Sequence, residues 1–122
     1  MTTTTPSRPS HKRGDVMLVL FPHSDLRTAK PRPALVVQAN NLQTGLPQTI
    51  VAMISSNISR ANHPSRVLIP VSGPEGRQSG LLSDSVVMTD NRATIAEAAI
   101  DRKIGTLPMS GVDKALRHTL SL

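Results

Sequence analysis

The stretch TAKPRPALVV, residues 28–37, sets one arginine, Arg32, between two prolines and follows it directly with apolar residues. An apolar run of this length that contains Val and Leu predicts a buried strand. Proline fixes its own φ angle and biases the residue before it toward extended backbone, so Pro31 and Pro33 leave Arg32 few conformations. The stretch therefore predicts a rigidly held cation at the mouth of a core strand.

The side chain of Arg32 has two possible uses. A guanidinium is charged at any working pH, and its planar set of donors suits the oxygens of a phosphate. The alternative is an ion pair with a carboxylate at the rim of a small barrel. The residues by themselves favour neither interpretation.

Further apolar runs of strand length lie on both sides of this stretch. They are DVMLVLF (15–21), TIVAMI (49–54), RVLIPV (66–71) and SVVMT (85–89). The segments between them carry the Pro, Gly, Asn and Ser of loops, and SGPEGRQSG (72–80) is expected to be a plain hairpin connection. Several short strands at this spacing predict a mainly β protein, either a small barrel or a sandwich.

The spacing of the apolar residues changes at SGVDKALRHTL, residues 110–120. Val112, Leu116 and Leu120 recur every four residues, which predicts a C-terminal helix packed on the barrel. Ser110 is expected to be its N-cap, with Asp113 three residues later as a variant of the capping box. At the other end, residues 1–12 are rich in Thr, Ser and Pro and predict a flexible tail, so the folded domain is expected to span 13–122.

Composition narrows the function classes. The 122 residues carry 14 Lys and Arg against 8 Asp and Glu, a formal net charge of +6, which favours a polyanionic partner such as nucleic acid or an acidic protein segment. One Phe without Trp or Tyr cannot build a base-stacking platform. The chain has no Cys, and its four His share no metal-ligand spacing, so no metal or other cofactor is expected. No apolar run is long enough to span a bilayer, which predicts a soluble, cytoplasmic protein.

Several blocks of the sequence resemble one family in order. They are KRGDVMLVLFP (12–22), KPRPALVV (30–37), IVAMISSNI (50–58), GLLSDSVVMTDNRATI (80–95) and IDRKIGTL (100–107). Together they resemble the PemK/MazF family of toxin endoribonucleases from toxin–antitoxin pairs. The resemblance implies an SH3-like barrel with a C-terminal helix, a homodimer, an acidic antitoxin as partner, and metal-independent cleavage of single-stranded RNA.

The resemblance also assigns roles to individual residues. Arg32 matches the arginine that the family associates with the scissile phosphate. Ser55 matches a position that is usually Thr and keeps its hydroxyl, and Asp90 matches an acidic residue that some members carry. Certain of those members have Arg two residues before the acid, where this chain has Met88; Arg92 is a possible replacement.

These residue types suit the reaction that the resemblance implies. Attack of a ribose 2′-OH on the adjacent phosphate needs a base, for which Asp90 is a candidate, and stabilisation of the developing charge, for which Arg32 is suited. Ser55 can donate a hydrogen bond to a non-bridging oxygen, and the general acid is left open. Further contacts to RNA are expected from Arg27, Lys30, Ser56, Asn57 and Arg92.

Two other functions stay open at this level. One is a relative of the same family that binds RNA or antitoxin with weak or no catalysis, because Met88 and Ser55 depart from the family pattern. The other is a non-enzymatic topoisomerase poison that resembles CcdB. That family relies on a C-terminal Trp-Gly-Ile, whereas this chain ends in HTLSL. The sequence does not indicate which RNA site is recognised.

Overall fold

The computed structural model describes residues 11–22 and 29–122. Its elements in chain order are β1 (Asp15–Pro22), β2 (Ala29–Val36), β3 (Gln48–Ser55), the 3-10 turn η1 (Ile58–Ala61), β4 (Arg66–Ile69), α1 (Pro74–Ser79), β5 (Ser85–Ala96), the 3-10 turn η2 (Glu97–Ala99), β6 (Ile100–Thr106) and α2 (Ser110–Leu120). The expected mainly β fold with a C-terminal helix is confirmed.

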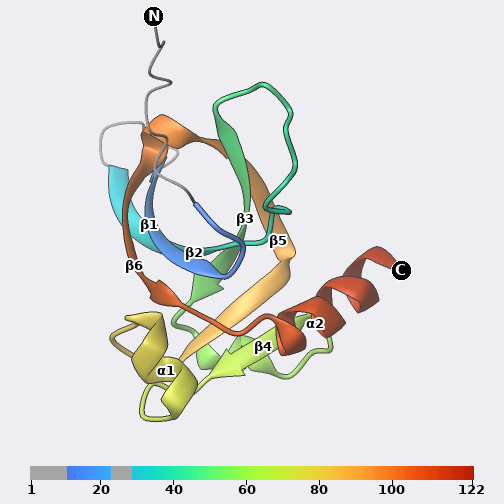
Figure 1. Ribbon diagram of the computed structural model, residues 1–122. Helices are drawn as coiled ribbons and strands as arrows, with labels where there is room; N and C mark the ends of the chain where they lie inside the picture. The colour runs from blue at the N-terminus through green and yellow to red at the C-terminus, as the bar shows by residue number, and fades with distance from the viewer. Residues whose placement is uncertain (1–10, 23–28) are drawn as a thin grey trace, which may run out of the picture.

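The six strands form one antiparallel sheet in the order β4-β5-β3-β2-β1-β6. Figure 1 shows how β1, β2, β3, β5 and β6 curve round a common centre, with α1 and α2 at one end. The edge strands β4 and β6 do not pair, because β4 has only four residues and ends where Ile69 meets Ser85 of β5. The expected small SH3-like barrel is therefore an open one, because the sheet curls without closing.

Both faces of the central strands are buried. On one face, Leu35 of β2 joins a cluster that includes Val16 of β1 and Val112 of α2. On the other face, Ala34 and Val36 join a cluster built from strand residues alone. Burial on two sides explains why the apolar runs of the sequence show little alternation between apolar and polar residues.

A bulge interrupts β5 halfway. Met88 pairs with Met53 of β3, but Ala52, the next residue back on β3, pairs with Arg92. Residues 89–91 are therefore extra on β5. An odd number of extra residues reverses which side chains face which side, so Val87 and Ile95 lie in different clusters although eight positions separate them.

Two segments differ from the expectation. Residues 74–79, within the predicted hairpin loop, form the short helix α1, and Ile100–Thr106 forms the strand β6 that the apolar pattern did not predict. Gly80 ends α1 with a left-handed φ of 73°. A Cβ on Gly105 of β6 would lie 2.3 Å from the backbone oxygen of Gln78, so α1 rests directly on the backbone of β6.

The C-terminal helix occupies the expected residues but starts differently. Its N-cap is Met109, in right-handed helical conformation and without a side-chain capping bond. The prediction that Ser110 caps the helix is therefore wrong, because the chain already turns helical one residue earlier. Val112 and Ala115 are buried, and Asp113 pairs with Arg13 just before β1.

The first described residues already contact the domain. The amide of Lys12 donates to the Asp15 carboxylate at 2.9 Å. Residues 1–10 lie outside the described part of the chain, and the expected tail boundary stays a prediction. Within the described residues, no helix has the length and apolar character that crossing a membrane requires.

The close contact between α1 and β6 can be tested with one methyl group. Gly105→Ala should lower the free energy of unfolding by about 1–3 kcal/mol, because the new Cβ meets backbone atoms that have no room to move. Gly111→Ala is the matched control, since its nearest neighbour, Val67 Cγ1, is 3.7 Å away. Urea unfolding of both variants measures the difference. Equal stability of Gly105→Ala and the native chain would contradict the packing.

Candidate active site

A cavity of about 610 Å³ opens between β2, the end of β3 and the segment after α1. Its lining residues are Leu18, Pro31, Arg32, Pro33, Met53, Ile54, Ser55, Ser56, Arg60, Gly80, Leu81, Leu82, Ser83, Ser85, Met88, Asn91, Arg102 and Ile104. The lining contains three arginines and several hydroxyl groups, but no Asp or Glu. We call it the arginine cavity.

The prolines of β2 explain why the cavity opens there. Residues Ala34–Val36 of β2 pair with β3, whereas Ala29–Pro33 pair only with β1. Pro31 and Pro33 have no N–H and cannot donate to a further ladder. The sheet is therefore split between the first half of β2 and the end of β3, and Arg32 lies at this split.

The three arginines of the lining come from different elements: Arg32 from β2, Arg60 from η1 and Arg102 from β6. Among the described residues, no carboxylate lies within ion-pair distance of Arg32 or Arg60, and Arg102 has only its exposed neighbour Asp101 at 3.9 Å. In the described part of the chain, Arg32 thus has no carboxylate with which to form the alternative, an ion pair at the rim. Three cations gathered without acid favour an anionic ligand.

Ser55 is the last residue of β3 and is half-buried in the cavity wall. Its Oγ accepts the backbone N–H of Asn57 at 3.1 Å. A hydroxyl that accepts in this way still has its own hydrogen to donate. This contact therefore leaves the hydrogen of the Ser55 hydroxyl available for a ligand oxygen.

The other residues expected to contact RNA divide into two groups. Ser56 lines the arginine cavity beside Ser55. The second group, Lys30, Asn57 and Arg92, does not line it. Lys30 is exposed on β2, and Asn57 accepts a hydrogen bond from the amide of Ser59 at the start of η1. Arg92 donates to the Thr89 carbonyl at 2.6 Å. Arg27 lies outside the described residues.

Asp90 lies in the bulge of β5. Its two carboxylate oxygens accept from Arg66, Oδ2 from Nη2 at 2.8 Å and Oδ1 from Nε at 3.3 Å. The hydrogen bond from Arg66 is the main reason why the pKa of Asp90 lies below its usual value, and partial burial opposes this shift. Asp90 does not line the arginine cavity, although its neighbour Asn91 does.

The cation next to Met88 comes from a different segment than expected. Arg92 donates to the Thr89 carbonyl, whereas Arg60 Nη1 lies 3.9 Å from Met88 Sδ. Arg60 and Arg102 are the cavity residues that the sequence did not single out. Arg60 stands in a loop segment and Arg102 in a strand with a weak apolar pattern, so neither gave a signal of its position.

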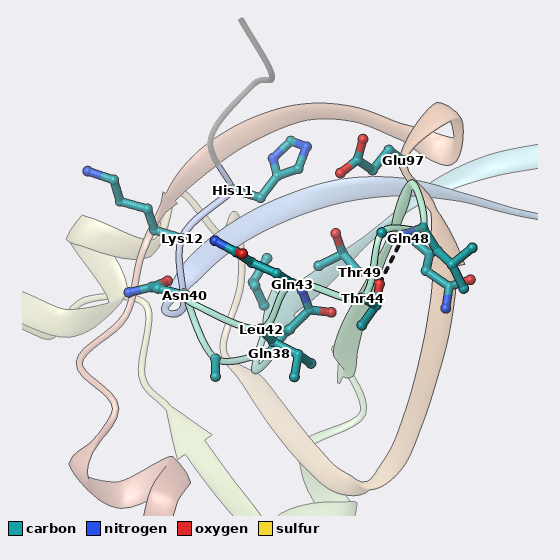
Figure 2. A pocket seen from close by; sticks show the side chains of 14 residues that line it. His11, Lys12, Gln38, Asn40, Leu42, Gln43, Thr44, Gln48, Thr49 and Glu97 are labelled. Atoms are coloured by element: carbon teal, nitrogen blue, oxygen red, sulfur yellow. Dashed lines mark hydrogen bonds between the residues drawn. The ribbon is translucent and has the colours of Figure 1, made fainter. Parts of the chain in front are cut away.

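A second cavity, of about 660 Å³, lies at the connection from β2 to β3 (Figure 2). Its polar lining consists mainly of amides and hydroxyls, among them Gln38, Gln48 and Thr49, and includes one cation, Lys12, together with the carboxylate of Glu97. It has no arginine. The arginine cavity is therefore the better site for a phosphate, although it is slightly smaller. In the part of the chain that the structure describes, no three His, Asp or Glu side chains are grouped as metal ligands.

The comparison with protein families agrees with this chemistry. Residues 12–120 match the family described as PemK-like, MazF-like toxin of type II toxin-antitoxin system. The chain belongs to this family. Endoribonuclease MazF6 of Mycobacterium tuberculosis H37Rv is 33% identical over 107 residues, which span 84% of this chain and 90% of that protein. Endoribonuclease EndoA of Bacillus subtilis 168 is 33% identical over 115 residues, 91% of this chain and 95% of that protein.

Solved structures show the same fold. The toxin MazF-mt6 of Mycobacterium tuberculosis superposes with a TM-score of 0.68 at 23% identity, over 88% of this chain and 97% of that chain. A crystal structure of MazE-MazF from Deinococcus radiodurans gives a TM-score of 0.70 at 15% identity, over 94% and 99%. A mycobacterial endoribonuclease in complex with its cognate antitoxin also gives 0.70, at 20% identity, over 92% and 96%.

The ion pair of Asp90 makes stability depend on pH in a defined direction. Because the folded pKa is lowered, the carboxylate stabilises the fold above its unfolded pKa of about 3.9, and this contribution is lost as pH falls through the folded pKa. Asp90→Asn should therefore have a lower melting temperature than the native chain near pH 7, and the gap should shrink below about pH 4. Melting curves at low salt measure it. A gap that is constant from about pH 3 to about pH 8 would contradict the ion pair.

Proposed function

We propose that the chain is the toxin of a toxin–antitoxin pair and cleaves single-stranded RNA, including messenger RNA, in the arginine cavity. The observation that carries the proposal is the presence of three arginines and Ser55 in the lining of one cavity that contains no Asp or Glu. Membership of the PemK/MazF family and two relatives named endoribonuclease support it. We expect it to act in the cytoplasm, where messenger RNA is translated.

The reaction follows from the substrate. The 2′-oxygen of a ribose forms a bond to the adjacent phosphorus, and the bond from phosphorus to the 5′-oxygen of the next nucleotide breaks. The 2′-OH loses a proton and the leaving 5′-oxygen gains one, so the products carry a 2′,3′-cyclic phosphate and a 5′-OH. The chain's contribution is mainly electrostatic, because negative charge grows on the phosphate oxygens in the transition state.

Arg32 and Ser55 are the proposed catalytic groups. Arg32 has no carboxylate partner among the described residues, so its planar set of donors is available to two phosphate oxygens. Ser55 donates to a non-bridging oxygen, because the Asn57 amide already occupies one lone pair of its Oγ. Ser56 lies next to it in the cavity lining.

The role of Asp90 as general base stays a prediction. A base works best with a pKa near the operating pH, whereas the pKa of Asp90 lies below its usual value. Both of its oxygens accept from Arg66. A guanidinium keeps its protons at any working pH and is a poor proton donor, so water is the proposed acid.

The partners that we propose for this chain, an acidic antitoxin and a second copy of the chain, are inferred from the same cavity. An acidic antitoxin segment would bind the cations that bind RNA, and a relative of similar fold has been solved with its cognate antitoxin. We propose a homodimer in which RNA crosses both copies. Leu82 lines the cavity and is 98% exposed, and an apolar side chain in that position suits burial by a second copy.

One observation favours a second candidate, a family member that binds RNA or antitoxin without cutting. Asp90, which lies between the cavity residues Met88 and Asn91 in sequence, is bonded to Arg66. If catalysis requires a free carboxylate, this chain lacks one in the lining of the arginine cavity. A cleavage assay with purified protein separates the two candidates.

The proposed chemistry predicts cleavage without metal. Single-stranded RNA should be cut equally fast in EDTA and in magnesium, because the substrate supplies its own nucleophile. Mass spectrometry of the fragments should find 2′,3′-cyclic phosphate and 5′-OH ends. Activity that EDTA abolishes and magnesium restores would contradict the mechanism, as would cleavage of a substrate whose scissile ribose is 2′-deoxy.

The role of Arg32 predicts a specific ranking of variants. Arg32→Lys keeps the charge but loses the planar donors, so single-turnover cleavage should fall steeply while the melting temperature barely changes. Arg32→Ala should be slower still, and Ser55→Ala should lose on the order of 10²-fold. Arg77→Lys, at an exposed position on α1, is the matched control. A destabilised Arg32→Ala that cleaves at the full rate per folded molecule would refute the assignment.

A further inference from the structure

Arg66 joins two segments that border the arginine cavity. Its Nε and Nη2 donate to the Asp90 carboxylate on β5, and its Nη1 donates to the backbone carbonyl of Arg60 on η1 at 3.1 Å. All three nitrogens of this guanidinium are therefore engaged. The side chains of Arg66 and Asp90 are only 23% and 34% exposed.

The bulge places Asp90 between two residues of the cavity lining. Met88 and Asn91 both line the arginine cavity, and Asp90 lies between them in sequence without lining it. Residues 89–91 have no partner on β3, so the ladder of the sheet does not fix them from that side. The bond from Asp90 to Arg66 is a restraint on the bulge from the side of β4.

The same restraint reaches the catalytic side of the cavity through η1. Arg60 lines the cavity, and its side chain lies against Met88. The 3-10 turn that carries it has four residues and none of them is buried, so packing alone holds it weakly. The bond from Arg66 to the Arg60 carbonyl ties this turn to the bulge.

We propose that Asp90 and Arg66 act as positioning residues: together they clamp η1 to the bulge of β5 and so hold Arg60 beside Arg32 and Ser55. The inference rests on the proposed RNA cleavage and gives Asp90 a role other than general base. Arg60 is then a phosphate-binding group of the site. The clamp explains why an acid next to a phosphate site does not repel the substrate: its charge is neutralised by an arginine that does not line the cavity.

The experiment compares three single variants, Asp90→Ala, Asp90→Asn and Arg66→Gln, with the double variant Asp90→Ala/Arg66→Gln. Single-turnover cleavage of an RNA oligonucleotide is measured at saturating enzyme from about pH 5 to about pH 9. Binding is measured with the same oligonucleotide carrying a 2′-deoxy ribose at the cut site. Asp113→Asn is the matched control, because it breaks an ion pair of similar exposure with Arg13 at the start of α2.

The clamp predicts that Asp90→Ala and Arg66→Gln each slow cleavage by about 10-fold to 100-fold at every pH, because Arg60 loses its position. The double variant should be no slower than either single variant, since both changes remove the same contact. Asp90→Asn should lose less than Asp90→Ala, because its amide oxygen still accepts from Arg66. The charge-swapped variant Arg66→Asp/Asp90→Arg should recover part of the rate.

A general base at Asp90 predicts the opposite pattern. Asp90→Asn would be as slow as Asp90→Ala, and the charge swap would recover nothing. Arg66→Gln would stay active near pH 8 and lose rate at a higher pH than the native chain, because the carboxyl would be freed from the group that lowers its pKa. His63, which also lowers that pKa and packs edge-on to His118, is present in all variants. This pattern would overturn the clamp.

A readout without cleavage separates this inference from the proposed function. Hydrogen exchange of the backbone amides in residues 57–66 should speed up in Arg66→Gln and Asp90→Ala but not in Asp113→Asn. Unchanged exchange in these variants would overturn the clamp even if RNA is cut. If the native chain cuts no RNA, the proposed function fails. The clamp is then decided by the exchange data alone.

Discussion

Burial of β2 on both faces is the constraint on which the rest of the structure depends. Leu35 packs toward α2, while Ala34 and Val36 pack into the cluster of strand residues. A shift of one residue would move each of these side chains to the opposite face, so the register with β1 and β3 is strongly fixed. Residues 29–33 of β2, which include both prolines, directly precede these fixed residues in the same strand. Arg32 is therefore held by a core strand while its side chain lies at the edge of the pairing with β3.

The second constraint is the bulge of β5. Val87 of this strand packs into one core cluster and Ile95 into the other, on the opposite face of the sheet. The odd number of extra residues in the bulge moves the later side chains to that opposite face. The extra residues lie at the arginine cavity, where Asn91 lines the wall and Asp90 meets Arg66. The irregularity that the core requires thus also shapes the site, and Arg66 with Asp90 stabilises a segment that regular strand pairing cannot hold.

The sequence predicts those features that depend on local pattern. The apolar runs of β1 to β5 and the C-terminal helix follow from composition and period, since each contributes apolar side chains to the core. β6 was not predicted because its residues 101–103 are Asp, Arg and Lys, all exposed. α1 has six residues and two buried positions, too few to show a helical period. The bulge that carries Asp90 was not predicted, because Thr-Asp-Asn is also typical of turns and gives no local signal that distinguishes the two.

Site residues were predictable only where backbone chemistry marks them. Arg32 stands out because two prolines surround it, and Ser55 because it ends an apolar run. Arg60 and Arg102 reach the cavity through the pairing of distant segments, which one sequence does not reveal. Two Asp residues next to the cavity lining in sequence are paired with a cation, Asp90 with Arg66 and Asp101 with Arg102, whereas Asp84 accepts the backbone N–H of Val71.

This distribution of charge links catalysis to inhibition. The arginine cavity has cations in its lining and no acid, so its potential is positive for any polyanion that approaches, whether RNA or an acidic peptide. In the proposed function, an acidic antitoxin that fills the cavity would neutralise the groups proposed to stabilise the transition state and would displace the substrate at the same time. Inhibition of this kind would need no conformational change in the toxin. Because the arginines are solvent-facing, salt screens both interactions, and the balance between the two anions depends on how many cations each contacts at once.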